Sequence, residues 1–294
     1  MKHIILVNPV SGNRKGKKHG IAILKLLKKY NIEAKIIIST KKGELTDISK
    51  KFSSKYKCRF YSVGGDGTLN EIVTGIFGTD SEIVVIPCGT GNDFVKSISK
   101  YRSLRKIVKE SIGKQSVKTD VIKLNNDRYC INILNTGFDA MVAKNLDLFR
   151  KVPFISGKAK YNLSIFYTLL MNKNFKFKIR YDSKNYVKGT YTLAAICNGM
   201  YYGGGIAPCK NVNVCDGIIN TCIVDSTRVR QKIILLPKYK KSNHFNLKKV
   251  HLNTCHSISI VSKHKFPVSI DGEIIYTNRV KATLIKEAIN IVHI

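Results

Sequence analysis

The first 120 or so residues alternate short apolar runs with longer stretches in which apolar residues recur every three or four positions. Short apolar runs predict buried strands, and the longer period predicts helices with one apolar face. The expected strands are residues 3–8, 34–39, 60–63 and 82–86, and the expected helices are residues 21–30 and 43–53. This alternation predicts a parallel sheet with helices on both faces.

After residue 120 the strand-like runs lie closer together, with turn residues between them. They cover residues 129–134, 175–181, 186–197, 218–224, 250–252, 257–261, 268–270 and 273–276. Residues 160–170 form the one stretch that is apolar enough for a helix. This pattern is typical of an antiparallel sandwich or barrel. The sequence therefore predicts an α/β domain over residues 1–120 and a β-rich antiparallel sandwich domain over residues 121–294.

The charge balance favours an anionic partner. The chain has 51 Lys and Arg against 19 Asp and Glu, a formal net charge of +32. Phospholipid head groups and nucleic acid are the two obvious anionic surfaces. No aromatic-basic RNA motif or DNA-reading helix is apparent, so no specific nucleic acid is expected. The excess is mostly lysine spread along the whole chain, and a lysine-rich genome would produce the same excess, so charge alone does not decide.

The compartment follows from apolar run lengths and cysteine usage. No apolar run approaches the roughly 18–20 residues of a membrane span, and residues 1–9 are too short in their apolar part for a signal peptide. The eight cysteines form no CxxC pair, and the spacing of Cys209, Cys215 and Cys222 fits no zinc pattern. Reduced thiols are expected. The prediction is a cytoplasmic protein that associates peripherally with a membrane.

The segment from Gly64 to Glu71, with sequence GGDGTLNE, is the most informative motif. It follows an apolar strand and precedes a helical pattern, and Thr68 and Glu71 have the spacing of a capping box. Glycines before a helix N-terminus let the backbone approach a ligand closely and direct N–H groups at it. Phosphate is the natural guest, although a lone glycine turn is more often a plain strand-to-helix turn.

Two similar turns follow other strands, at residues 8–12 (NPVSG) and 87–94 (PCGTGNDF). In a parallel sheet all three turns emerge at the carboxyl edge, where open α/β sheets bind ligands. Together they predict a nucleotide phosphate site, although each alone is an ordinary loop. The site is neither a P-loop nor a dinucleotide-binding loop, because GxxxxGK[ST] and GxGxxG are both absent.

Asp271 and Glu273 are the candidate acid–base groups, in the stretch SIDGEII. Two carboxylates two apart on a strand would point to one side, where one could accept a proton and the other could orient the substrate or help hold a cation. The alternative is a plain hairpin turn at Asp-Gly, which the spacing by itself favours. Asp216 is a candidate magnesium ligand on the same kind of evidence, and the alternative there is a loop followed by a turn.

Taken together, these blocks resemble the bacterial diacylglycerol kinase family of lipid kinases, which is related to the ceramide and sphingosine kinases. The matching stretches begin at Asn8 and end at Glu273. They are residues 8–12, 64–71, 89–94, 137–140, 198–199, 202–205, 216–217 and 271–273. The GGDGT stretch also occurs in NAD kinases, whereas GTGNDF and the late DGE point to the lipid branch.

The resemblance implies a nucleotide-binding α/β domain, ATP and Mg²⁺ as cofactors, and catalysis at Asp271 and Glu273, one of them as general base. It implies a structural Mg²⁺ on Asp216, helped by main-chain oxygens of Asn213 and Ile218, although residues 211–215 lack the acidic neighbour that some members carry. Residues 280–294 would fold back onto the first domain. The ATP site would be lined by Asn8, Pro9, Ser11, Gly12, Thr40, Gly64, Gly65, Asp66, Gly67, Thr68, Leu69, Asn70 and Thr90.

The function expected is therefore ATP-dependent phosphorylation of a lipid hydroxyl, with diacylglycerol converted to phosphatidic acid as the first choice. The expected partner is a lipid substrate at an anionic membrane surface, and a homodimer is considered. Two alternatives stay open. One is a soluble-substrate kinase of the NAD kinase type, and the other is a basic nucleotide- or nucleic-acid-binding protein without enzymatic activity.

Overall fold

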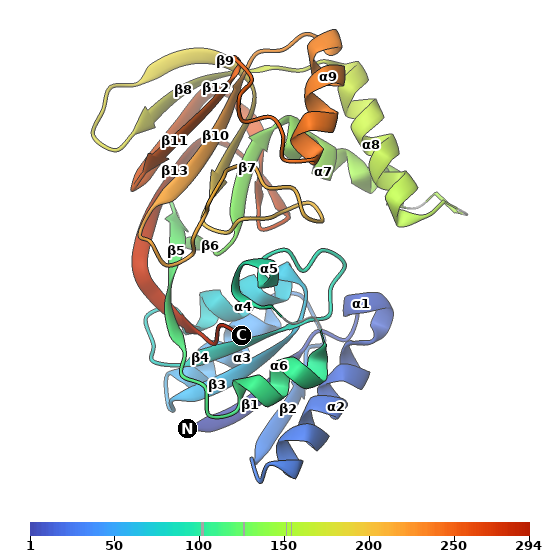
Figure 1. Cartoon of the computed structure of the whole chain (residues 1–294), viewed down its shortest axis with the longest axis vertical. Helices are drawn as coiled ribbons and strands as arrows, with labels where there is room; N and C mark the ends of the chain where they lie inside the picture. The colour runs from blue at the N-terminus through green and yellow to red at the C-terminus, as the bar shows by residue number, and fades with distance from the viewer. Residues whose placement is uncertain (101–102, 126, 151, 154) are drawn as a thin grey trace.

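The computed structural model has two domains, one above the other in Figure 1, and it describes residues 1–100, 103–125, 127–150, 152–153 and 155–294. The N-terminal domain contains four strands that pair in parallel in the order β4-β3-β1-β2. These strands are β1 Lys2–Val7, β2 Ala34–Ile38, β3 Cys58–Gly64 and β4 Glu82–Pro87.

Alternate residues of these strands face two separate cores. Ile4 and Leu6 pack with helices α3 and α4, whereas Ile5 and Val7 pack with helices α2 and α6. The sheet is therefore covered by helices on both faces. The helices of this domain are α1 Ser11–Arg14, α2 Gly16–Lys29, α3 Glu44–Ser53, α4 Asp66–Ile76, α5 Val95–Ile98 and α6 Leu104–Ser111.

The C-terminal domain is built from antiparallel pairs. Strands β7 and β8 each pair with both β9 and β12, so these four strands close around an apolar interior that includes Leu134, Phe177, Ile196 and Val268. The strands are β5 Val117–Leu124, β6 Arg128–Cys130, β7 Ile133–Gly137, β8 Phe175–Tyr181, β9 Val187–Cys197, β10 Ile219–Asp225, β11 Val250–Cys255, β12 Ser257–Ile270 and β13 Glu273–Ile291.

Three helices cover the outer face of β7, β9 and β10: α7 Phe138–Arg150, α8 Gly157–Met171 and α9 Val229–Lys240. The predicted helix at residues 160–170 is confirmed by α8, whereas α7 and α9 were not predicted. Helix α7 follows β7 directly, at Gly137 with φ +89°. Because no polar turn separates the two elements, the pattern in the sequence does not show where the strand ends.

Two long antiparallel strands, β5 and β13, join the domains (Figure 1). The last residues of β13, Asn290 and Ile291, pair in parallel with Glu82 and Ile83 of β4. The final residues of the chain therefore lie on the N-terminal domain. The expected boundary between residues 120 and 121 falls inside β5. Asp120 accepts hydrogen bonds there from the N–H groups of Gly217 (2.7 Å) and Glu287 (2.8 Å).

Candidate active site

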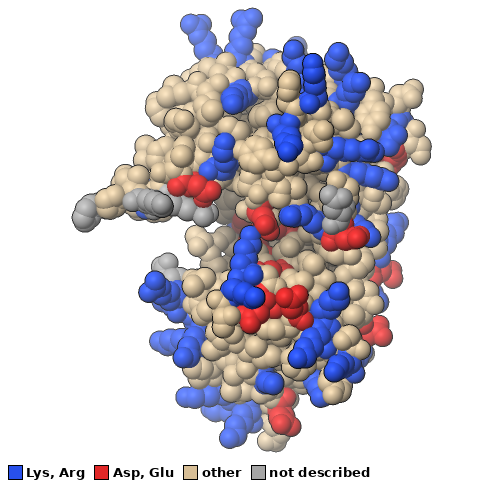
Figure 2. Space-filling view, turned by 180° about the vertical axis from the view of Figure 1, so that it is seen from behind, with Lys and Arg blue, Asp and Glu red and all other residues tan. Residues whose placement is uncertain are grey.

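A cavity of about 900 Å³ lies between the two domains, within the roughly 300–1,000 Å³ typical of ligand sites. Figure 2 shows acidic side chains around the hollow between the domains, while Lys and Arg are spread over both of them. The predicted site residues that line the cavity are Asn8, Pro9, Ser11, Gly12, Thr40, Gly65, Gly67, Thr68, Asn70, Thr90, Asp271 and Glu273. The three glycine-containing turns and the late acidic pair therefore share one cavity.

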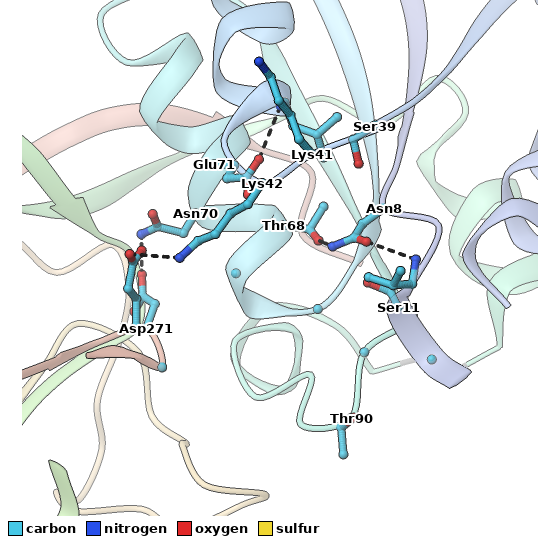
Figure 3. A pocket seen from close by; sticks show the side chains of 18 of the residues that line it. Asn8, Ser11, Ser39, Lys41, Lys42, Thr68, Asn70, Glu71, Thr90 and Asp271 are labelled. Atoms are coloured by element: carbon cyan, nitrogen blue, oxygen red, sulfur yellow. Dashed lines mark hydrogen bonds and ion pairs between the residues drawn. The ribbon is translucent and has the colours of Figure 1, made fainter. Parts of the chain in front are cut away.

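The first turn is held by Asn8, directly after β1. Its Oδ1 accepts the N–H of Val10 at 3.2 Å, and its Nδ2 donates to Thr68 Oγ1 at 3.2 Å (Figure 3). Gly12 has φ +58°, and a Cβ there would lie 2.2 Å from the carbonyl oxygen of Cys88. Only glycine permits this approach, so the turns after β1 and β4 are packed against each other.

The second turn begins helix α4 at Asp66, three residues earlier than the predicted capping box, with Thr68 as the N-cap, requires. The capping-box prediction is wrong: Gly65 is the N-cap and no side chain caps it, while Glu71 Oε2 accepts the N–H of Leu45 at 3.3 Å. N–H groups in the first turn of a helix have no intrahelical partner, so they are available to an anion.

Gly67, in that first turn, lines the cavity, and a Cβ added there would meet no protein atom within 4 Å. Its φ is not in the left-handed region. Neither backbone strain nor protein crowding therefore accounts for glycine at this position. The free space at Gly67 is what a phosphate group needs to approach the backbone, so this turn fits the nucleotide that the resemblance implies.

Three predicted ATP-site residues lie outside the cavity lining. Gly64 ends β3, where a Cβ would lie 2.2 Å from Thr68 Oγ1. Leu69 is buried in the core beneath α4. Asp66 accepts the N–H groups of Asp93 and Phe94, both at 3.1 Å, and its burial raises the pKa of its carboxyl group. These residues shape the glycine turn without facing the ligand space.

Residues 39–42, after β2, contribute lining side chains that the sequence reasoning missed apart from Thr40. Thr40 donates from its N–H and its Oγ1 to Glu44 Oε2, at 2.5 and 2.9 Å. These hydrogen bonds lower the pKa of Glu44. Lys41 and Lys42 follow Thr40 directly. A pair of lysines just after a strand of the parallel sheet was the feature of the sequence that could have indicated these lining residues.

Glu71, Ala143 and Asp147 were also missed. Ala143 and Asp147 belong to α7, a helix that the sequence pattern did not reveal.

The late carboxylates are not side by side on one strand as expected. Ile270 pairs with Glu273, and Asp271 (φ +47°) and Gly272 (φ +91°) form the two-residue turn between β12 and β13. The hairpin alternative is confirmed, since two consecutive positive φ values are typical of a type I′ turn. Both carboxylates nevertheless line the cavity.

Asp271 accepts hydrogen bonds on both carboxylate oxygens. Oδ2 accepts from Asn70 Nδ2 at 2.8 Å and from the N–H of Ile131 at 2.9 Å. Oδ1 accepts the N–H groups of Asn132 and Ile133, at 3.0 and 3.1 Å, and the thiol of Cys130 at 3.1 Å. Burial raises the pKa of Asp271, and these donors oppose that rise because they stabilise the charged form.

Glu273 has a different environment. Its side chain is 49% exposed, and Oε1 forms an ion pair with Lys42 Nζ at 3.0 Å. Lys42 belongs to the N-terminal domain and Glu273 begins β13, so the pair crosses the cavity between the domains. Exposed pairs of this kind stabilise a fold by at most about 1 kcal/mol. The contact therefore leaves Glu273 able to exchange Lys42 for another partner.

The predicted metal loop, residues 213–218, lies apart from the cavity. Asn213 Oδ1 accepts the N–H of Cys215 at 3.1 Å, and Asp216 Oδ1 accepts the N–H of Ile218 at 3.0 Å. Within the described part of the chain, no three His, Cys, Asp or Glu side chains gather as a metal site requires. The structural Mg²⁺ stays a prediction, and this donor set is a poor fit for it.

Lys286 supplies positive charge at this loop instead. A Cβ on Gly217 would lie 2.3 Å from Lys286 Cε and 2.7 Å from its Nζ, so the lysine lies directly over the glycine. Burial and the charge of Asp120 raise the pKa of Asp216, and Lys286 opposes them. The Lys286 ammonium group thus provides this loop with positive charge close to the carboxylates of Asp120 and Asp216.

An α/β domain with glycine turns facing a β-sandwich across a polar cavity is the arrangement of a two-domain kinase. Residues 2–124 match the family described as "Diacylglycerol kinase catalytic domain" and residues 132–293 match the "YegS C-terminal NAD kinase beta sandwich-like domain". The chain belongs to the lipid kinase family that combines these two domains. Two proteins of Staphylococcus aureus (strains MSSA476 and Mu50), each named "Putative lipid kinase", are 28% identical to it over 271 residues, covering 87% of this chain and 85% of theirs.

Solved structures share the fold. A structure titled "Crystal structure of a putative diacylglycerol kinase from Bacillus anthracis str. Sterne" superposes with a TM-score of 0.81 at 24% identity, covering 100% of this chain and 97% of that one. An NAD kinase from Archaeoglobus fulgidus in complex with ATP superposes with a TM-score of 0.55 at 12% identity, covering 99% and 93%. Within the described residues, no helix is both long and apolar enough to cross a membrane.

Proposed function

We propose that the chain is an ATP-dependent lipid kinase that transfers the γ-phosphate to a lipid hydroxyl, with diacylglycerol as the first substrate. One observation carries the proposal: the glycine turns of the N-terminal domain and the carboxylates of Asp271 and Glu273 line one cavity. Phosphoryl transfer needs a phosphate cradle and a proton acceptor within reach of each other.

The N-terminal side of the cavity would hold the nucleotide. First-turn N–H groups of α4, the open backbone at Gly67 and the turn at residues 8–12 face the cavity. Mg²⁺, arriving with ATP, would offset the negative charge that develops on the transferred phosphoryl group. Lys41 and Lys42 at the rim add positive charge for the phosphate tail.

The two carboxylates would divide the remaining work. Asp271 accepts hydrogen bonds from five donors, which come from both domains. This bonding suits a residue that fixes the position of the hairpin relative to Asn70. To accept a proton, Asp271 would first have to release one of them. Glu273 is half-exposed at the same cavity and needs only to leave Lys42. We therefore assign the general base to Glu273 and the positioning of the site to Asp271.

A soluble-substrate kinase of the NAD kinase type is the second candidate, because the structure shares its fold with an ATP-bound NAD kinase. At 12% identity this likeness concerns the fold alone. The domain match to diacylglycerol kinases, over residues 2–124, supports the lipid substrate instead.

Turnover of labelled ATP tests the proposal against a panel of diacylglycerol, ceramide, undecaprenol, phosphatidylglycerol and NAD. We expect label in a lipid product, first with diacylglycerol, and none in NADP. Label in NADP alone would establish the second candidate. No transfer to any acceptor, in the presence of Mg²⁺ and with ATP binding intact, would overturn the kinase assignment.

A further inference from the structure

Helix α8 carries apolar side chains on two sides. On its inner side, Tyr161, Ile165 and Leu169 pack against the core of the C-terminal domain. On its outer side lie Leu163, Phe166, Tyr167 and Leu170, spaced as one stripe of a helix, and all of them are exposed. Phe166 is 59% and Leu170 is 64% exposed. The outer stripe therefore contributes little to the core of this chain.

Helix α9 also carries exposed apolar side chains. It lies beside α8 (Figure 1), and Lys232 Nζ joins the two helices by donating to Asn172 Oδ1 at 2.8 Å. Ile233 and Ile234 of α9 are 54% and 62% exposed. We call the six residues Leu163, Phe166, Tyr167, Leu170, Ile233 and Ile234 the outer apolar face. Clustered exposed apolar side chains mark a contact surface, whereas scattered ones do not.

The charged residues of α8 and α9 have one sign. Arg230 and Lys238 lie exposed on α9, Lys241 follows α9, and Lys173 follows α8. Neither α8 nor α9 contains Asp or Glu. An apolar surface flanked by cations is typical of helices that lie in the interface of an anionic bilayer. The charge pattern thus favours a lipid surface as the occupant.

The outer apolar face is also continuous with the candidate active site. Helix α7 lines the cavity with Ala143 and Asp147, and its next residue, Leu148, is 60% exposed. Phe149 of α7 contacts the ring of Tyr167 in α8, with 6.1 Å between centroids. One helix pair therefore connects the cavity to the exposed stripe.

We propose that the outer apolar face, with its flanking cations, docks the enzyme on an anionic phospholipid bilayer. This proposal rests on the proposed function, since it explains how a lipid hydroxyl reaches the cavity. With α8 and α9 at the bilayer, the acyl chains of a substrate stay in the membrane while its head group passes along α7 to Glu273.

Co-sedimentation with vesicles tests the proposal. The wild-type protein should bind vesicles of phosphatidylglycerol and phosphatidylcholine more tightly than vesicles of phosphatidylcholine alone. Phe166→Ser/Leu170→Ser should weaken binding to the anionic vesicles on the order of tenfold or more. In the wild type, both apolar side chains leave water when the protein binds the bilayer, and serine gains little from that transfer. Arg230→Gln/Lys238→Gln/Lys241→Gln should abolish the preference for the anionic vesicles and the salt dependence of binding.

The matched control is Ile21→Ser/Val187→Ser, which removes two exposed apolar side chains remote from α8 and α9. It should bind vesicles as the wild type does. Unchanged vesicle binding by Phe166→Ser/Leu170→Ser would overturn the proposal. So would conversion of a wild-type dimer into a monomer by that variant with vesicle binding unaltered, since the face would then join two copies of the chain.

Activity on a water-soluble, short-chain diacylglycerol separates this proposal from the proposed function. The Phe166→Ser/Leu170→Ser variant should keep wild-type activity on the soluble substrate and lose activity on vesicle-borne substrate. If the wild type binds anionic vesicles but phosphorylates no lipid, the kinase proposal fails and the docking surface stands. If the variant phosphorylates both the soluble and the vesicle-borne substrate as fast as the wild type does, the docking proposal fails and the kinase proposal stands.

Discussion

Asn70 of α4 donates its side-chain amide to Asp271 at 2.8 Å, across the two domains and across 201 positions of sequence. The same Nδ2 also donates to the carbonyl oxygen of Tyr129, at 2.8 Å. One amide thus ties the glycine-turn helix to the hairpin and to β6. The relative placement of phosphate cradle and carboxylates depends on this contact.

Asn70→Asp is therefore expected to disrupt the site. The replacement has the same shape, but it puts a carboxylate oxygen where the amide NH₂ group now donates. That oxygen would face two other acceptors, the Asp271 carboxylate and the Tyr129 carbonyl oxygen. Turnover should fall about 100-fold or more, and the thermal midpoint should drop. Asn246→Asp makes the same chemical change on an exposed loop and should leave both quantities unaltered. Full activity in Asn70→Asp would show that the contact does not organise the site.

Gly67→Ala tests the phosphate cradle. Because no protein atom lies within 4 Å of the added Cβ and alanine favours helices, the free energy of unfolding should stay level or rise by up to about 1 kcal/mol. The KM for ATP should rise roughly tenfold, since the methyl group fills the space that a phosphate needs.

Gly157→Ala, in the first turn of α8, also meets no atom within 4 Å and serves as the control, with an unchanged KM. An unchanged KM in Gly67→Ala, measured by steady-state kinetics, would place the phosphates elsewhere.

The two late carboxylates should respond differently to amide substitution. Glu273→Gln should lower kcat by about 10²–10⁴-fold with little effect on stability, because the side chain is half-exposed and would lose a proton acceptor. Asp271→Asn should instead destabilise the fold, on the order of 3 kcal/mol, because its NH₂ group would face backbone N–H donors that the carboxylate now accepts.

Glu33→Gln, on an exposed loop, is the control for both. Denaturant unfolding and kcat are the two measurements. A destabilised Glu273→Gln that keeps its kcat would reverse the assignment of the base.

Asp139 makes stability depend on pH. It is buried beside Tyr202 and Tyr239, and burial raises its pKa to about 6, whereas the unfolded value is near 3.8. The folded state therefore binds more protons between these values, and the free energy of unfolding falls as pH rises from about 4 to about 6. The shift corresponds to about 3 kcal/mol.

Asp139→Asn should remove this fall, because an amide stays neutral and can still accept from Tyr202. Urea unfolding at pH 4.5 and pH 7 measures the effect, with Asp80→Asn as the exposed control. If Asp139→Asn retains the wild-type pH dependence, the titrating group is another one.

Removal of divalent metal should leave the nucleotide-free protein as stable as before, since Lys286 already lies over Gly217 at the predicted metal loop. Thermal midpoints with EDTA and with millimolar Mg²⁺ should therefore agree. Lys286→Met should lower the midpoint, and Mg²⁺ should restore part of it, because Asp216 and Asp120 then lack a nearby cation. A wild-type midpoint that drops in EDTA would indicate a resident metal.

Local signals in the sequence were sufficient for the four parallel strands of the N-terminal domain, for helix α8 and for the three glycine turns. Periodicity located β1 to β4, and the Asp-Gly pair predicted the hairpin at Asp271, because both depend on backbone geometry within a few residues. The change of pattern near residue 120 predicted the two domains, and the family resemblance, carried by motifs such as GTGNDF, indicated the kinase class. Strand β5 was missed because its apolar residues lie among lysines.

What only the tertiary structure decided is which side chains meet. Asp271 faces the backbone of residues 131–133, Glu273 pairs with Lys42, and Asp66 turns away from the cavity, all through contacts between distant segments. Likewise, the sequence predicted only that residues 160–170 form a helix, and the packing of the domain shows that one apolar side of α8 is left exposed. The hydrophobic pattern of a segment indicates how much apolar surface the segment can bury. The tertiary fold determines which of its side chains pack against a neighbouring element.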